Sequence, residues 1–96
     1  MAVVRHDYFR TTRINSATTT QVKLGPAVLK SIVFGTIVAA GETIQIQDGN
    51  GTTNTPIVTI TTTADLKPVW FDFQIRCTNG IRIITSGTSD LAVSWY

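Results

Sequence analysis

The sequence predicts an all-β protein, an antiparallel β-sandwich of jelly-roll or immunoglobulin-like layout, with an open barrel as the alternative. Three observations lead to this fold class. About seven short segments alternate apolar and polar residues, turn residues separate them at intervals of roughly 8–12 residues, and no stretch has the periodicity of an amphipathic helix. Threonine, valine and isoleucine are abundant, and they favour extended backbone because branching at Cβ restricts χ1.

The length and composition bound the domain organisation. The 96 residues make one domain, with 43% hydrophobic and 15% charged residues. A chain of this size buries roughly 60–65% of its unfolded surface, so its stability alone is marginal and a partner subunit would help. We therefore expect a homo-oligomer, with a trimer favoured and a dimer as the alternative.

Residues 1–17 are interpreted as an N-terminal arm, because they mix charged and aromatic side chains without a clean period. The arm carries the whole net charge of +2, since the charges of residues 18–96 balance. Such a segment can bind nucleic acid, or it can lie across a neighbouring protein or supply an edge strand. The weak field and the lack of a polybasic tract favour the protein partner. The candidate contact residues are Arg5, Tyr8, Phe9, Arg10 and Arg13.

The sandwich is expected to span residues 18–96 and to begin with strands over Thr18–Leu24 and Val28–Phe34. The first of these ends at the turn dipeptide Gly25-Pro26. The second has apolar residues in both phases of the alternation. We interpret this pattern as a strand that also touches a neighbouring subunit or a loop, with a short helical turn as the alternative.

The middle of the chain alternates again over Thr43–Asp48, with Ile44 and Ile46 facing the core. The glycine- and threonine-rich stretch from Asp48 to Pro56 predicts a long, exposed and mobile loop. A strand follows over Ile57–Thr63. Its core-facing residues are either Val58 and Ile60 or, in the other phase, Ile57, Thr59 and Thr61.

The clearest strand signal in the chain is Val69–Cys77, in which apolar and polar residues alternate strictly. The next apolar stretch begins at Ile81. A three-residue loop over residues 78–80 would place Cys77 opposite Ile81 and keep one face apolar, with Gly80 in the left-handed position that closes the turn. We therefore predict a β-hairpin with a glycine bulge.

The chain ends inside a last strand, Leu91–Tyr96. A terminal pair of aromatic residues without a polar tail would favour unwanted adhesion if it were exposed. We therefore expect Trp95 and Tyr96 to lie at a subunit interface.

The sequence offers no constellation of catalytic residues, and we expect neither an enzyme nor a cofactor. The single histidine, His6, lies in the arm, and the lone cysteine, Cys77, is interpreted as a small buried hydrophobe. No signal peptide or membrane-spanning apolar run is visible, so we expect synthesis in the cytoplasm and no membrane partner.

Two features near the long loop could still bind a ligand. The Asp48-Gly49-Asn50-Gly51 stretch resembles part of a calcium loop, but the later ligands are missing, so we interpret it as a turn. An outward-facing Trp70 could stack on a sugar ring, although covering the sheet or an interface is the favoured role. The residues of this possible ligand site are Asp48, Asn50 and Trp70.

Several patterns in order along the chain resemble a family of small β-sandwich proteins from the virions of tailed bacteriophages. They are a threonine run at residues 18–20, Gly25-Pro26-Ala27-Val28-Leu29-Lys30-Ser31-Ile32, Thr43 to Asp48, Trp70-Phe71-Asp72-Phe73, Asn79 to Gly87, and Leu91 to Tyr96. The resemblance covers most of the chain from Thr18 onward. The arm departs from the shorter start of that family, so its role is inferred from this sequence alone.

This resemblance implies a capsid decoration (cement) protein or another small, multicopy virion component without catalysis or cofactor. The expected partner is the major capsid protein, and the expected location is the capsid surface. The rival interpretation is a carbohydrate-binding or host-adhesion module on a tail or head fibre, which would use Trp70 and the loop from Asp48 to Pro56.

Overall fold

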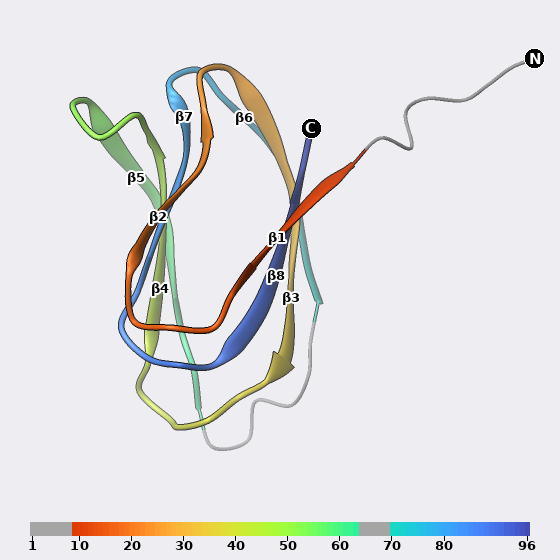
Figure 1. The fold of residues 1–96 in the computed structure, drawn as a ribbon, viewed down its shortest axis with the longest axis vertical. Helices are drawn as coiled ribbons and strands as arrows, with labels where there is room; N and C mark the ends of the chain where they lie inside the picture. The colour runs from red at the N-terminus through yellow and green to blue at the C-terminus, as the bar shows by residue number, and fades with distance from the viewer. Residues whose placement is uncertain (1–8, 64–69) are drawn as a thin grey trace, which may run out of the picture.

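The structure is a computed structural model that describes residues 9–63 and 70–96. These residues form eight β-strands and no helix (Figure 1). The strands are β1 Arg10–Ile14, β2 Thr19–Leu24, β3 Ala27–Thr36, β4 Thr43–Gly49, β5 Asn54–Thr61, β6 Trp70–Cys77, β7 Gly80–Thr85 and β8 Asp90–Trp95. The predicted all-β sandwich is therefore confirmed.

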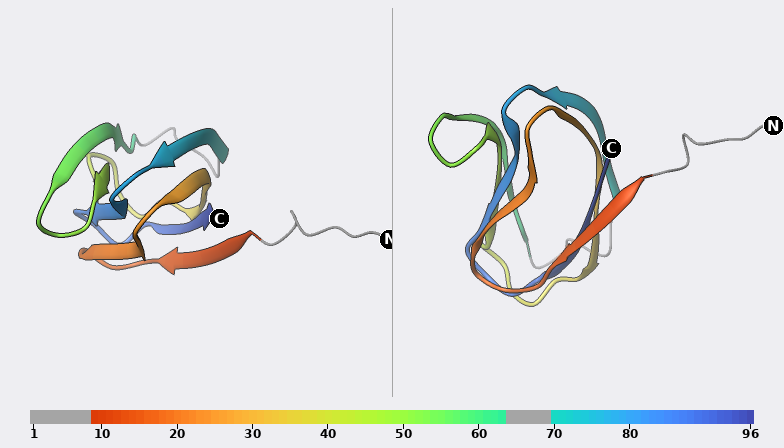
Figure 2. Two further views of the ribbon diagram at one scale, coloured as in Figure 1. Left: turned by 90° about the horizontal axis from the view of Figure 1, so that it is seen from above. Right: turned by 45° about the horizontal axis from the view of Figure 1, so that its top comes forward.

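The strands form two antiparallel four-stranded sheets that pack face to face (Figures 1 and 2). Sheet A has the order β1-β8-β3-β6, and sheet B has the order β2-β7-β4-β5. The pairs β1·β8, β2·β7, β3·β6 and β4·β5 are those of one long antiparallel ribbon rolled around a core. This is the jelly-roll layout. It differs from the immunoglobulin layout, which places its first two strands in one sheet.

The core lies between the sheets and is almost entirely aliphatic. Its fully buried residues are Leu29, Ile32, Phe34, Ile46, Cys77, Ile81, Ile83 and Val93, with Ile14, Ala27, Ile44 and Leu91 at 8% exposure or less. The Phe34 ring meets the Phe71 ring edge-on, with 5.9 Å between the ring centroids. The predicted core positions Ile44 and Ile46 are confirmed. Cys77 is buried as expected, and burial is the main reason that the pKa of its thiol rises to about 11.

The predicted hairpin between β6 and β7 is wrong. Strand β6 pairs with β3 in sheet A, whereas β7 pairs with β2 and β4 in sheet B. Residues 78–79 carry the chain across from one sheet to the other. The apolar faces themselves are as predicted, since Cys77, Ile81 and Ile83 are all buried. Both a hairpin and a crossover keep these residues facing inward, so the alternation could not distinguish the two.

The mixed apolar pattern of β3 has a cause within the chain. The register of β3 shifts between Leu29 and Ser31 against both of its neighbours, so Lys30 is an extra residue opposite β8. Such a bulge reverses the alternation. Leu29 before it and Ile32 after it therefore both face the core at 0% exposure. The predicted contact with a neighbouring subunit is not needed to explain the pattern.

Two boundaries differ from those predicted. The residues assigned to an arm over 1–17 include strand β1, which lies at the edge of sheet A, one of the two alternatives considered for this segment. Residues 1–8 lie outside the described part. The long loop expected from Asp48 to Pro56 is shorter, because β5 already begins at Asn54. The Asn50 carboxamide oxygen accepts hydrogen bonds from the backbone N–H groups of Thr52 and Thr53 and closes a tight turn.

Strand β5 follows neither predicted phase. Its register against β4 shifts because Ile57 is an extra residue between Pro56 and Val58. Ile57 and Ile60 are half-buried, and Val58 is exposed. The bulge again explains why a single period could not describe the strand.

Candidate interaction face

The outer face of sheet A presents a row of side chains that crosses all four of its strands. Arg13 of β1 lies opposite Ala92 of β8, Ala92 lies opposite Val33 of β3, and Val33 lies opposite Trp70 of β6. Residues opposite one another in an antiparallel sheet point to the same face. Trp70 is 65% exposed and Val33 is 40% exposed. We call this row, with the hollow beside it, the outer row of sheet A.

A shallow hollow of about 330 Å³ lies at the β1 end of the outer row. The side chains and backbone that line it belong to Thr11, Arg13, Val33, Gly35, Asp90, Leu91 and Ala92. At its rim the Arg13 guanidinium donates two hydrogen bonds to the Asp90 carboxylate, at 2.8 and 3.1 Å. The hydrogen bond and charge of Arg13 hold the pKa of Asp90 below its usual value. The rim is thus polar but internally neutralised.

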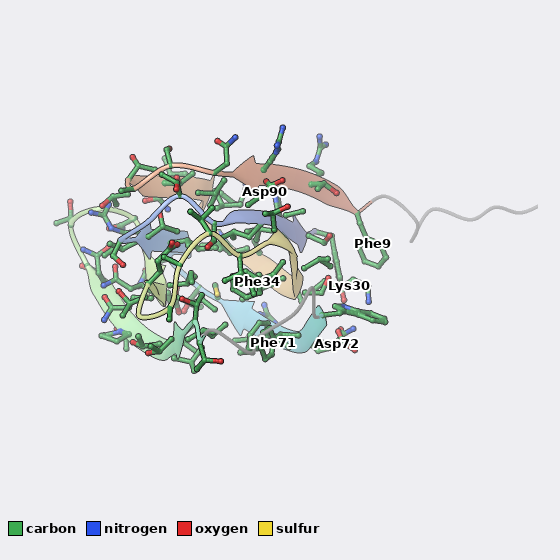
Figure 3. The ribbon with its side chains drawn as sticks, turned by 90° about the horizontal axis from the view of Figure 1, so that it is seen from below. Phe9, Lys30, Phe34, Phe71, Asp72 and Asp90 are labelled. Carbon is green, nitrogen blue, oxygen red and sulfur yellow. The ribbon has the colours of Figure 1, made fainter. Side chains whose placement is uncertain are left out.

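A second group on this face surrounds Lys30, the bulge residue of β3. Its ammonium nitrogen lies 4.8 Å from the centre of the Phe9 ring and 4.0 Å from the Asp72 carboxylate. The Phe9 ring packs on Tyr96 at a centroid distance of 5.1 Å. Figure 3 shows Phe9, Lys30 and Asp72 gathered at one end of the sandwich. Phe9 and Tyr96 remain 42% and 49% exposed, so the face has a second apolar surface beside the start of β1.

Two further residues that were expected to make contacts, Arg10 of β1 and Trp95 of β8, lie opposite each other on the inner side of sheet A. The Arg10 guanidinium stands over the Trp95 ring, 5.9 Å from its centroid. The Trp95 indole N–H donates a 3.3 Å hydrogen bond to the Thr12 hydroxyl, and its ring packs against the core. Of the two predicted interface residues, only Tyr96 presents its ring outward. Arg5 and Tyr8 lie outside the described residues.

The Asp48 carboxylate is bound within the fold. One oxygen accepts hydrogen bonds from the backbone N–H and hydroxyl of Thr78, and the other accepts them from the N–H groups of Asn79 and Gly80, at 2.8–3.3 Å. Burial alone would raise the pKa of Asp48, but these donors outweigh burial and hold the pKa below its usual value. Asp48 thus fastens the crossover between the two sheets.

The structure does not bring the three residues of the possible ligand site together. Asp48 contacts the residue after the end of β6, whereas Trp70 begins that strand. The eight residues of β6 separate them by about 25 Å at the usual rise of a strand. Asn50 is engaged in its own turn. Trp70 therefore stands apart from the loop, on the outer row of sheet A.

Sequence reasoning missed Lys30, Val33 and Ala92 as parts of this face. The bulge at Lys30 turns Val33 outward, and no local signal marks a bulge. Ala92 alternates with the buried Leu91 and Val93 in β8. The sequence does not show that β8 pairs with β3, because this pairing joins segments that are distant along the chain.

Within residues 9–63 and 70–96, no cluster of three or more histidine, cysteine, aspartate or glutamate side chains is arranged to hold a metal ion. The described part also contains no helix long and apolar enough to cross a membrane. No known family's sequence model matches the chain, and no curated protein matches it significantly.

Proposed function

We propose that this protein is a structural component of a bacteriophage virion, a capsid decoration protein that binds the outer surface of the head. It bridges subunits of the major capsid protein and stabilises the shell. The observation that carries this proposal is the outer row of sheet A, where Trp70 and Val33 lie opposite each other and are both exposed. The resemblance to small phage β-sandwich proteins supplies the class of partner.

The outer row has the chemistry of a protein-binding surface. Tryptophan is enriched among the residues that dominate interface energies, because a rigid, largely apolar ring loses little entropy when it is buried. Arg13 and Asp90 at the rim already satisfy each other, so docking a capsid subunit there leaves no new charge unpaired. The apolar centre and polar rim match the usual anatomy of an interface.

The start of β1 lies on the same side of the molecule as this surface. Phe9 and Tyr96 extend it at the end where the N-terminal residues join the sandwich. In the proposed complex, the arm residues Arg5 and Tyr8 reach a neighbouring capsid subunit while sheet A rests on the first. Each copy then links two subunits.

A matched pair of valine substitutions tests the docking face. Val33 on sheet A is 40% exposed, and Val58 on sheet B is 37% exposed. Val33→Glu is expected to weaken binding to purified capsids that lack the chain by at least about tenfold, whereas Val58→Glu is expected to bind like the unsubstituted protein. Equal binding of both variants, measured by cosedimentation, would contradict the proposed face.

A second candidate function is a glycan-binding adhesion module of a phage fibre. The exposure of Trp70, at 65%, is the observation that favours it, because an aromatic face can stack on a sugar ring. A glycan array probed with the chain and with Trp70→Ala tests it. Trp70-dependent binding to defined sugars, without capsid binding, would replace the decoration role with this one.

A further inference from the structure

We infer that the free edge of β1 pairs with the same edge of a second copy of this chain, forming a two-fold dimer with one continuous sheet. The inference goes beyond the proposed function and does not depend on it. It starts from the four edge strands of the sandwich, β1 and β6 in sheet A and β2 and β5 in sheet B.

Three of these edge strands carry an irregularity of their own that blocks further pairing. Strand β2 has Val22 as an extra residue against β7, and β5 has Ile57 as an extra residue next to Pro56, which lacks an N–H donor. Strand β6 has one residue more than β3 between their paired positions, and Gln74 there has a φ of 57°. Bulges and proline are recognised means of protecting a sheet edge from other strands.

Strand β1 is the exception. Its five residues pair with β8 in an unbroken register, from Arg10 opposite Trp95 to Ile14 opposite Leu91. Charged side chains can also protect an edge, but both arginines of β1 are engaged by their own sheet, Arg13 by Asp90 and Arg10 by the Trp95 ring. Among the described residues, no strand covers the other side of β1.

The hydrogen-bond pattern identifies which backbone groups of β1 face this free edge. Tyr96 exchanges two hydrogen bonds with Val28 of β3, so its N–H and C=O point toward β3. Successive residues of a strand alternate in direction, so Trp95 and Val93 point toward β1 and bond to Arg10 and Thr12. The N–H and C=O groups of the remaining residues, Thr11 and Arg13, therefore point outward.

This arrangement is complementary to itself. A two-fold axis normal to the sheet, midway between Thr12 and its copy, pairs residues 10–14 with residues 14–10 of the second copy. Thr11 then lies opposite Arg13 of the partner subunit, and the two such pairs make four N–H···O bonds that use every outward group of the strand. Thr12 lies beside its own copy, a favourable cross-strand pair, and no arginine lies opposite an arginine.

The other edges also explain why the partner is a copy in a closed dimer. A ring of three or more copies needs two different edges that fit each other. Among the described edge strands only β1 has a regular register, so the edge that can pair with β1 is the β1 edge of a second copy. The pairing joins two four-stranded sheets into one of eight strands and places two outer rows on one continuous face.

Proline at position 11 is the most selective test. Thr11→Pro removes an outward N–H that β8 does not use, and proline is tolerated where that group faces away from the sheet. We expect the unsubstituted chain to sediment as a dimer in equilibrium with monomer, and Thr11→Pro to sediment as a monomer with cooperative thermal unfolding retained. Thr11→Ala is the matched control, because it removes the same side chain, keeps the N–H and is expected to remain a dimer.

A cysteine at the predicted axis provides an independent readout. Two copies of Thr12→Cys lie close enough at the axis for a disulfide, whereas Thr11→Cys is two residues out of register with its copy. The native Cys77 is fully buried and gives no background. We expect mild oxidation to give a covalent dimer of Thr12→Cys and none of Thr11→Cys. An unsubstituted chain that is monomeric at all concentrations or trimeric, or a dimer unaffected by Thr11→Pro, would overturn the inference.

Discussion

Replacing Asp48 with alanine is expected to destabilise the protein by releasing the crossover between the two sheets. The carboxylate accepts four hydrogen bonds from residues 78–80. Hydrogen bonds to a charged group contribute about 1.5–3 kcal/mol each when they are buried, but water replaces much of that at a partly exposed site. Taking about 0.5 kcal/mol for each bond, we expect a loss of about 2 kcal/mol.

In a domain of 96 residues, a loss of this size lowers the melting temperature by about 8–16 °C. The assay is thermal unfolding followed by circular dichroism at neutral pH, for the unsubstituted protein and for Asp48→Ala. Asp72→Ala is the matched control, because the contact of that carboxylate within the described residues is an ion pair with Lys30 at 4.0 Å. We expect the control to change the melting temperature little.

The effect of Asp48→Ala should also depend on pH. The pKa of Asp48 in the folded protein lies below its ordinary value of 3.8, so the unfolded chain takes up the proton first as the pH falls. The stabilisation is therefore complete above pH 3.8 and is lost as the pH falls through the lower pKa of the folded state. The difference between the variant and the unsubstituted protein should shrink in acid. A variant as stable as the unsubstituted protein at neutral pH, or an unchanged difference in acid, would refute this reasoning.

Three further substitutions or reactions test other parts of the structure. Gly80→Ala should destabilise by more than about 2 kcal/mol in urea unfolding, because φ is 146° and a new Cβ would overlap the Lys23 carbonyl oxygen; unchanged stability would contradict the crossover geometry. Phe34→Ala should cost about 3–5 kcal/mol by removing a fully buried ring that packs on Phe71, whereas Phe34→Leu should cost less; an equal loss would contradict this packing. Cys77 should resist alkylation at pH 8 until denaturant is added, since it is fully buried and its pKa is about 11; rapid labelling of the native protein would show that the core is open.

The sequence was a good guide to which side chains face the core. The alternation in Trp70–Cys77 matches the observed burial, and Ile44 and Ile46 are buried as predicted, whereas Gln47, which the alternation places outward, is buried as well. It was a poor guide to which strands pair, because a hairpin and a crossover after Cys77 preserve the same inward faces. What holds the crossover is Asp48, 30 residues before Thr78, and a contact over that separation leaves no local signal.

Bulges and distant charge pairs account for the other differences. The extra residues Lys30 and Ile57 reverse the alternation, so β3 and β5 each mix two phases. Strand β1 was included in the arm because residues 1–17 mix charged and aromatic side chains without a clean period. In the structure, Arg13 is neutralised by Asp90, which is 77 residues away along the chain. Trp70 could be placed on an outer face from the sequence, but its neighbours Val33 and Ala92 depend on strand pairing.

The proposed decoration role is tested most directly by the copy number of this chain in purified phage particles. Quantitative mass spectrometry would compare it with the major capsid protein. A decoration protein is predicted to be present at a ratio near one to one, or one to a small integer. A ratio of a few per cent, or the absence of the chain from the particles, would contradict this role.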